Sequence, residues 1–400
     1  MQKKDRLNQT ELRTAAALAS IFFLRMLGLF MLLPVLALYA RRIEGATPFL
    51  IGAALGIYGL TQAALQIPLG RWSDRIGRKP VIAIGLFIFT AGGAVAAISG
   101  QISAIIAGRA LQGAGAISGA VLALASDLTR PQQRTKVMAL IGISIGLAFS
   151  SAFVLGPWLD SVFGLVGLFW IAASLGLLAI PILIYGVPKP PRFVTSEPGE
   201  ARHITWPPAR GLVSLYIGVF CLHGILAASF VSIPVLLQDG LGLESGRHFR
   251  IYIPVLIVSM LCVTPMIMLS HRAKVGQALF RLAILTVLLG ELVLWLGPMH
   301  KMTVVAGLTA FFVGFNFLEA SLPSMVSRAA PEAGRGGALG TYSTAQFVGL
   351  FTGGIAGGAL YGSAGFRFVF AVAALSAGGW LIYSILVPVE EETDTDRSVG

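Results

Sequence analysis

The chain is 400 residues long, with 56 % hydrophobic and only 12 % charged residues and a mean hydropathy of +0.82. This balance excludes an ordinary soluble protein and indicates a chain that crosses a membrane many times. The net charge is +11, but the basic residues are scattered over many short polar segments instead of forming one patch. We therefore expect a lipid bilayer around the chain and no nucleic-acid partner.

Twelve apolar runs in the sequence come close to the roughly 20 residues that a helix needs to cross a hydrocarbon core. In chain order they cover residues 14–40, 49–69, 80–98, 102–127, 136–160, 164–186, 212–238, 246–270, 277–297, 301–327, 337–361 and 365–387. The sequence therefore predicts an all-α membrane protein with twelve transmembrane helices.

The polar segment Gly70–Lys79, between the second and third spans, orients the whole chain. It holds four Lys or Arg residues, and basic residues near span ends mark the cytoplasmic side. Because the number of spans is even, both termini are then cytoplasmic. Most of the 29 Lys and Arg residues fall on that same side.

A proline-rich polar segment in the middle of the chain separates the spans into two sets of six. Short sequences recur on either side of it, and Leu33–Leu36 resembles Ile233–Leu236. We predict an N-terminal half at 1–186, a cytoplasmic linker at 187–211, a C-terminal half at 212–388 and an acidic tail at 389–400. Two repeated halves with a substrate site near the midplane are a transporter architecture.

Several chemistries lack their signals in this sequence. Cys221 and Cys262 both lie inside spans, and nowhere does a His, Cys and carboxylate cluster have metal-ligand spacing. The phosphate-binding pattern Gly-x-x-x-x-Gly-Lys-Ser/Thr is also missing. We therefore expect no metal, no cofactor and no direct use of ATP.

The residues of Gly70–Lys79 indicate more than a basic loop that sets topology. Gly70 and Gly77 permit a tight reversal of the chain. Asp74 can sit at a helix N-terminus, and Arg78 offers a forked donor to a carboxylate. The sequence predicts a cytoplasmic gate at this point.

This segment resembles the signature Gly-x-x-x-Asp-Arg-x-Gly-Arg-Lys of the major facilitator superfamily. The matching residues are Gly70, Asp74, Arg75, Gly77, Arg78 and Lys79. Two further elements are similar to family motifs, the segment Arg109–Gly113 in span four and a glycine and proline motif of drug/proton antiporters in span five. The latter consists of Gly142, Gly146, Gly156 and Pro157.

The resemblance implies a twelve-helix fold of two pseudo-symmetric halves in the inner membrane of a bacterium. It implies alternating access and export of small amphipathic or hydrophobic molecules in exchange for protons, by a monomer. It also implies that Asp74 meets the start of span eleven near Gly336 and Gly337, and that Arg78 pairs with Asp127. Leu24–Phe30 and Leu318–Pro323 are similar to a proton-driven member with a soluble C-terminal domain, which we expect here to be absent or removed.

Charged residues inside spans cost about 2.5–3.5 kcal/mol each to insert, so each becomes a functional hypothesis. Arg25 and Glu319 both lie near the middle of their spans. Phe312, Asn316 and Glu319 recur on one face of span ten, and we expect this face to line the cavity. A carboxylate in a cavity of low dielectric suits the binding and release of a proton, with Arg25 tuning its affinity.

Several alternatives stay open at the sequence level. Glu319 carries a proton or is permanently paired with Arg25 or Arg109. His223 titrates or is a packed neutral side chain, and Arg109 takes part in coupling or is a hydrogen-bond anchor. Glu291 lies close enough to the end of span nine for its head to reach the interface, so we assign it no function.

The function also has rivals. Proton symport of a sugar or another nutrient is the main one, and the antiporter motif argues against it. A membrane-embedded enzyme would need a catalytic pair, and Glu319 with His223 makes a poor one. A sensor that transports nothing is the third.

Overall fold

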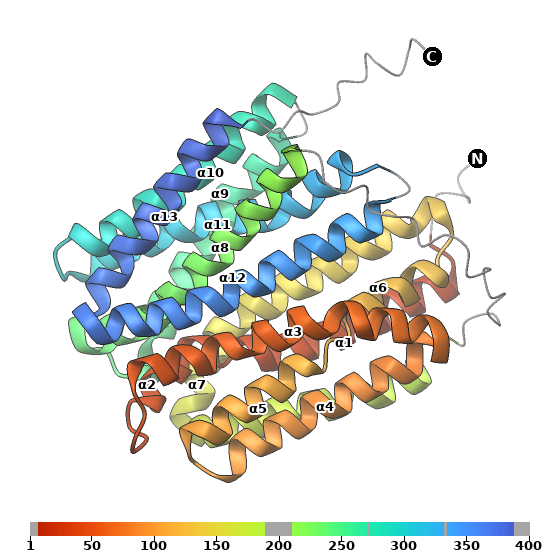
Figure 1. Cartoon of the computed structure of the whole chain (residues 1–400), viewed down its shortest axis with the longest axis horizontal. Coiled ribbons are helices and arrows are strands. Elements are labelled where there is room, and N and C mark those ends of the chain that lie inside the picture. The colour runs from red at the N-terminus through yellow and green to blue at the C-terminus, as the bar shows by residue number, and fades with distance from the viewer. Residues whose placement is uncertain (1–6, 189–209, 271–272, 332–333, 388–400) are drawn as a thin grey trace. The chain divides into compact units, whose positions relative to one another are not determined.

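The structure is a computed structural model that describes residues 7–188, 210–270, 273–331 and 334–387 (Figure 1). Within these residues all regular elements are helices, which confirms the predicted all-α class. The predicted linker 187–211 lies almost entirely outside the described residues, and the acidic tail 389–400 lies wholly outside them.

The chain divides into two compact units, and unit 1 holds the N-terminal part together with the short segment 243–249. Its helix α7 packs along α1 and α4, and α5 packs along α3 and α4. The elements are α1 (Gln9–Phe30), α2 (Leu33–Ala40), α3 (Pro48–Ile76), α4 (Arg78–Ile98), α5 (Ile102–Ala114), α6 (Ser118–Asp127), η1 (Pro131–Gln133), α7 (Arg134–Pro181), η2 (Ile182–Gly186) and η4 (Ser245–Arg247).

Unit 2 holds the rest of the chain from Pro198 onward. Its helix α8 packs along α12 and α13, and α10 lies between α11 and α13. The elements are α8 (Arg210–Val235), η3 (Leu236–Gly240), α9 (Phe249–Leu269), α10 (Ala273–Leu296), α11 (Lys301–Ala329), α12 (Arg335–Ala364) and α13 (Phe366–Leu386).

Eleven helical segments of the described chain are long and apolar enough to cross a membrane. One of them, 131–186, has 56 residues, which is more than twice the length that one crossing needs. Inside it Gly164 adopts φ 65 and ψ 179, a conformation that no helix contains and that glycine tolerates. This break falls where the predicted spans five and six meet.

Two predicted spans of unit 1 are each divided into two helices. The first bends after Phe30, before Pro34 in the first turn of α2, and the fourth is interrupted between α5 and α6. Gly115 stands at the second interruption, and a Cβ there would lie 2.3 Å from the carbonyl oxygen of Gly85. Only glycine therefore allows α4 and this bend to pack so closely.

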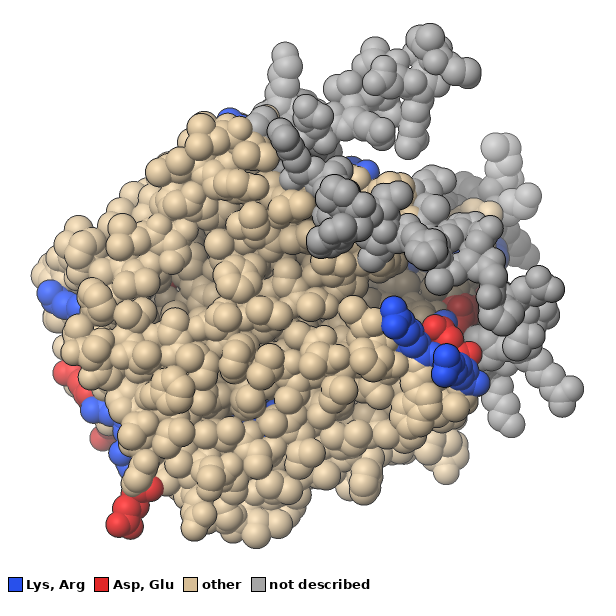
Figure 2. All heavy atoms as spheres, viewed as in Figure 1, with Lys and Arg blue, Asp and Glu red and all other residues tan. Residues whose placement is uncertain are grey.

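The surface of the helices suits a hydrocarbon environment. Large apolar side chains are exposed along their lengths, such as Phe87 at 64 %, Leu261 at 69 % and Leu375 at 73 %. On the face drawn in Figure 2 the charged side chains gather mainly at helix ends. Apolar patches of this extent indicate contact with lipid.

Candidate functional site

The predicted gate segment is mostly helical rather than a loop. Helix α3 continues to Ile76 and α4 begins at Arg78, so that Gly77, with φ 101, makes the turn alone. The prediction was therefore wrong for Gly70, which lies inside α3 and takes no part in the turn. Asp74 lies in the last turn of α3, and its approach to the N-terminus of another helix, at the start of span eleven, stays a prediction. The turn needs one residue with positive φ, and Gly77 supplies it.

Arg78 ties the ends of three helices together. Its guanidinium forms an ion pair with Asp74 of α3, and its Nε lies 3.4 Å from Oδ2 of Asp127 at the end of α6. It also donates to Oγ of Ser73 at 2.7 Å, and that hydroxyl donates to the carbonyl oxygen of Gly70 at 2.6 Å. Ser73 is fully buried. It could not be recognised from the sequence because it occupies a variable position of the signature.

The other basic residues of the gate segment differ in their surroundings. Arg75 is exposed, whereas Nζ of Lys79 donates to the carbonyl oxygen of Val187. The gating roles of these residues, and the approach of Asp74 to Gly336 and Gly337, stay predictions.

A second polar anchor at this end of unit 1 was missed by the sequence analysis. Glu11 is buried, and it accepts hydrogen bonds from Nε of Arg130 at 2.7 Å and from its Nη2 at 2.9 Å. These bonds raise the pKa of Arg130, so its charge persists at every physiological pH. The pattern Asn8-x-x-Glu11, which forms a capping box in α1, was the available signal.

Arg25 is fully buried inside unit 1. Its Nη2 donates at 3.0 Å both to Oε1 of Gln62 and to the carbonyl oxygen of Gly115 at the bend of span four. The guanidinium carbon stands 5.5 Å from the ring centroid of Phe89, and Nε and Nη1 have no hydrogen-bond partner among the described residues. The structure thus gives Arg25 the partners of a structural anchor.

Arg109 is similarly enclosed, with 1 % of its surface exposed. It donates to the carbonyl oxygen of Ala54 at 3.3 Å and to Gln112 at 3.1 Å, and it lies 5.2 Å from the ring centroid of Tyr58. These contacts favour the hydrogen-bond anchor over the coupling role. The same Tyr58 donates to Gln62, so the two arginines share one buried network.

Three helices of unit 2 bring Glu319 of α11, His223 of α8 and Gln346 of α12 together. Oε2 of Glu319 lies 3.4 Å from Nε2 of His223, and its Oε1 accepts a hydrogen bond from Gln346 at 3.4 Å. Glu319 is 38 % exposed while His223 is only 8 % exposed. The carboxylate of Glu319 can therefore contact water as well as a buried partner. Gln346 is a residue of this cluster that the sequence analysis missed.

Hydrogen bonds indicate which nitrogen of His223 carries the proton. Nδ1 lies 3.2 Å from the carbonyl oxygen of Val219, which can only accept, so Nδ1 is the donor. Nε2 lies 2.8 Å from the amide nitrogen of Gln346, an arrangement that suits a neutral imidazole accepting from the amide. A second proton, bound to Nε2, would make this atom a hydrogen-bond donor to Glu319.

With this geometry in view, the chain can be compared with known proteins. The sequence profile of the Major Facilitator Superfamily matches residues 18–332. The Inner membrane transport protein YajR of Escherichia coli (strain K12) is 42 % identical over 376 residues, which are 93 % of this chain and 82 % of that protein. The chain belongs to the major facilitator superfamily. It is a multi-pass membrane transporter.

Two further similarities are more distant. The class E tetracycline resistance protein of Escherichia coli is 29 % identical over 179 residues, 43 % of this transporter and 43 % of that protein. The crystal structure of a D-xylose-proton symporter superposes with a TM-score of 0.70 at 14 % identity, covering 92 % of this chain and 96 % of that chain. The second similarity concerns the fold alone.

The expected cavity face of α11 in this transporter needs a correction. Phe312 is fully buried, and its ring packs against Phe230, Phe311 and Phe315 within unit 2. It is therefore a packing residue rather than a cavity-lining one. Asn316 is partly exposed and donates from Nδ2 to Oγ of Ser259 on α9 at 3.2 Å. Helical spacing places residues on a common face, but neighbouring helices determine how deeply each of them is covered. A cavity-lining role for Asn316 stays a prediction.

The glycines of the antiporter motif in span five differ in their surroundings within unit 1. Gly156, followed by the buried Pro157, would bring a Cβ within 2.6 Å of the carbonyl oxygen of Met31 in the same unit. Gly142 and Gly146 are exposed, and a Cβ at either would meet nothing within 4 Å. Close packing thus holds for one of the three glycines, and its partner is span one.

Glu291 lies elsewhere than the sequence analysis placed it. Its side chain is fully buried in unit 2, where Oε1 accepts a hydrogen bond from Oγ of Ser229 at 2.8 Å. The expectation that its head reaches the interface was wrong. Counting residues from a span end gives depth along the helix, whereas the neighbouring helices determine exposure.

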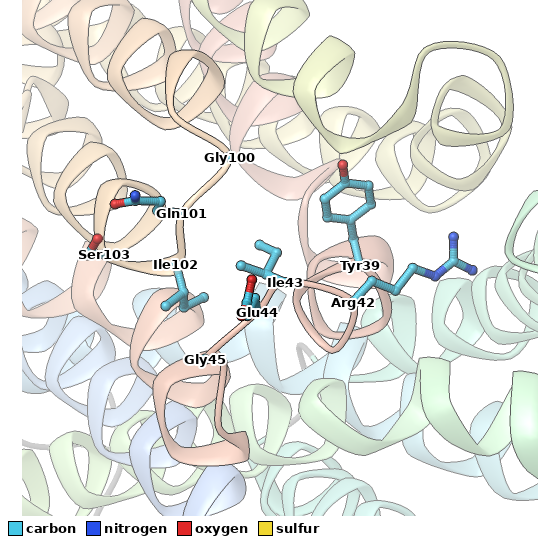
Figure 3. Close-up of a pocket in the computed structure, with 9 residues that line it drawn as sticks. All are labelled: Tyr39, Arg42, Ile43, Glu44, Gly45, Gly100, Gln101, Ile102 and Ser103. Atoms are coloured by element: carbon cyan, nitrogen blue, oxygen red, sulfur yellow. The ribbon is translucent and has the colours of Figure 1, made fainter.

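The described structure contains hollows away from Glu319 and His223. One of about 770 Å³ is walled by the turn after α2 and the start of α5, and its residues are Tyr39, Arg42, Ile43, Glu44, Gly45, Gly100, Gln101, Ile102 and Ser103 (Figure 3). A smaller one of about 120 Å³ lies between α9, α10 and α11. Neither includes Glu319 or His223, so we place no function in them.

Proposed function

We propose that this transporter exports small amphipathic or hydrophobic molecules in exchange for protons, by alternating access. The observation that carries the proposal is the cluster of Glu319, His223 and Gln346 within membrane-spanning helices of unit 2. A titratable carboxylate inside a span is rare and costly, and transporters use such groups to bind protons.

The cluster offers two arrangements that differ by one proton. When neither group carries an extra proton, Oε2 of Glu319 and Nε2 of the neutral His223 are two acceptors that face each other across 3.4 Å. A proton bound to either atom supplies a donor, so that a hydrogen bond forms between Glu319 and His223 while Oε1 of Glu319 keeps the amide of Gln346. Proton binding therefore changes the contacts between α11 and α8, which links protonation to conformation.

Twelve spans in two pseudo-symmetric six-helix halves form the framework of the proposal. The break at Gly164 supports it, since α7 then supplies two spans and the eleven apolar segments become twelve. With an even number, the basic segments and both termini face the cytoplasm. By analogy with YajR, the membrane is the inner membrane of a bacterium. We expect the working form to be a monomer.

The antiporter motif and the relative named for tetracycline resistance favour export of drug-like molecules over uptake of a nutrient. Proton symport of a sugar is the alternative, and the fold is compatible with it because the D-xylose-proton symporter shares the fold. One proton moving down a potential of 100 mV releases about 2.3 kcal/mol, which is enough to support a substrate gradient.

The purified transporter in proteoliposomes tests this proposal. Substrates are first selected as compounds that raise its melting temperature. Transport of a selected compound is then measured with pH gradients imposed in both directions. An antiporter moves the compound toward the more acidic side, against the proton flux, whereas a symporter moves it with the protons. Transport that ignores the sign of the gradient would contradict proton coupling altogether.

A further inference from the structure

Glu291 of α10 is a carboxylate that the mechanism above does not use. Its side chain is fully buried, and Oε2 has no hydrogen-bond partner among the described residues. Oε1 has a single donor, the hydroxyl of Ser229 on α8 at 2.8 Å. One neutral donor is far less than an ionised carboxylate needs when it leaves water.

The packing around Glu291 explains why it is enclosed. The preceding residue, Gly290, would place a Cβ within 2.7 Å of both the carbonyl oxygen of Gly307 and the backbone nitrogen of Phe311. Helices α10 and α11 therefore touch backbone to backbone beside the carboxyl group. Leu294, one turn further along α10, is 2 % exposed.

A cationic partner for Glu291 is missing among the described side chains of the helices that pack against it. No hydrogen bond or ion pair joins it to any charged or titratable group there. These groups are Arg281 on α10 itself, Lys301, Glu319 and Arg328 on α11, Arg367 and Tyr383 on α13, and Tyr216, Cys221 and His223 on α8. The geometry fits a neutral carboxylic acid.

We propose that Glu291 is a second proton-binding site, in series with the pair of Glu319 and His223. The inference rests on the proposed function and its orientation in the membrane. Helix α8 connects the two sites, because His223 and Ser229 are six residues apart, which is about 9 Å along the helix at a rise of ~1.5 Å per residue. With the linker in the cytoplasm, Ser229 and Glu291 are the outer site.

The hydroxyls of α8 give this outer site a route for protons. Ser232 stands one turn beyond Ser229 toward the outside, is fully buried, and its Oγ has no hydrogen-bond partner among the described residues. A proton from outside water forms the O–H bond of Glu291. On transfer inward that bond breaks, a new bond forms at Glu319 or His223, and water carries the proton across the gap between them.

Glu291→Gln is the decisive variant because the amide keeps an acceptor for Ser229 but binds no proton. Infrared spectra of the wild-type transporter at neutral pH should contain a protonated carboxyl band that this variant lacks. Proton-driven transport should fall at least tenfold, while counterflow at equal pH on both sides stays within twofold of wild type. Glu44→Gln, at an exposed carboxylate of the α2–α3 turn, is the matched control and should change neither.

Ser229→Ala keeps the proton-binding carboxyl and removes only its donor, so it remains informative if the first variant folds poorly. Its carboxyl band should shift to higher frequency and its pH profile should move. If Glu291 is neutral but only structural, the pH profile of transport stays unchanged in both variants, and this result would overturn the inference. Absence of the protonated carboxyl band from the wild-type spectrum would overturn it as well. Failure of the proposed function would be distinguishable from failure of this inference, because transport by the wild-type protein itself would then not respond to the pH gradient.

Discussion

The two units differ in the ionisable side chains that lie well inside their spans. Unit 1 carries Arg25 and Arg109 there, which contact amides, carbonyl oxygens and aromatic rings. Unit 2 carries Glu319 and Glu291, whose partners are a histidine, a glutamine and a serine. An arginine keeps its proton at every physiological pH, whereas a carboxylate or a histidine can gain and lose one.

This difference indicates which substitutions should affect proton coupling and which should affect the stability of the fold. The arginines of unit 1 hold bends and neighbouring helices in place, so substitutions there should lower stability. The carboxylates of unit 2 can titrate, so neutral substitutes of equal shape should alter proton coupling and leave the fold intact.

The largest loss of stability is expected for Arg25→Ala. The substitution leaves the carbonyl oxygen of Gly115 and the amide of Gln62 without their donor, at about 1–3 kcal/mol for each buried group. Thermal unfolding in detergent should show a clear drop in melting temperature, with the pH optimum of transport unchanged. An upward shift of the optimum would instead mean that Arg25 tunes Glu319, as the sequence alone suggested, and the division between the units would fail.

Gly156→Leu should have the next largest effect. Its side chain would collide with the backbone at Met31, and overpacking of this kind costs about 1–3 kcal/mol. The matched control is Gly142→Leu, since a Cβ at Gly142 meets nothing within 4 Å. Melting temperatures should fall for the first and stay near wild type for the second. Equal losses in both would show that the motif packs differently from the structure.

The smallest effect on stability is expected at the gate. Arg78→Ala removes contacts to Asp74 and Asp127 that are partly exposed, and such pairs contribute about 0–1 kcal/mol. If these contacts stabilise the state that is closed to the cytoplasm, single cysteines placed in the cavity should react faster with a reagent added from the cytoplasmic side. Arg75→Ala, at an exposed neighbour, is the control and should react at the wild-type rate. Equal rates for the two variants would disprove the gating role of the Arg78 contacts.

The membrane spans could be predicted from the sequence because they depend on the length of apolar runs. The pairing of Arg78 could be predicted because it depends on a local charge pattern. The end of α3 could not, since hydropathy records where apolar residues stop and not where the helix stops. Helix α3 runs past the apolar stretch until Gly77 breaks it. Counting apolar residues gives the length of a span, whereas the backbone conformation at Gly77 determines where the helix ends.

The candidate site was harder to predict than the fold, for a related reason. Glu319 and His223 were recognisable as charged or titratable residues within spans, but Gln346 was not, because an amide inside a span carries no comparable cost. Glu291 was misjudged since its burial depends on the contact between Gly290 and the next helix, α11, which a span considered by itself does not reveal. Depth in a bilayer follows from position in a span, whereas enclosure follows from tertiary packing.

The central claim is that Glu319 carries the coupled proton. Its most direct test is transport by Glu319→Gln in proteoliposomes, beside wild type and Glu44→Gln, with and without a pH gradient. If Glu319 carries the proton, Glu319→Gln loses uphill transport by tenfold or more, retains counterflow at equal pH, and no longer responds to pH. Full uphill transport by Glu319→Gln with the wild-type pH profile would contradict the account.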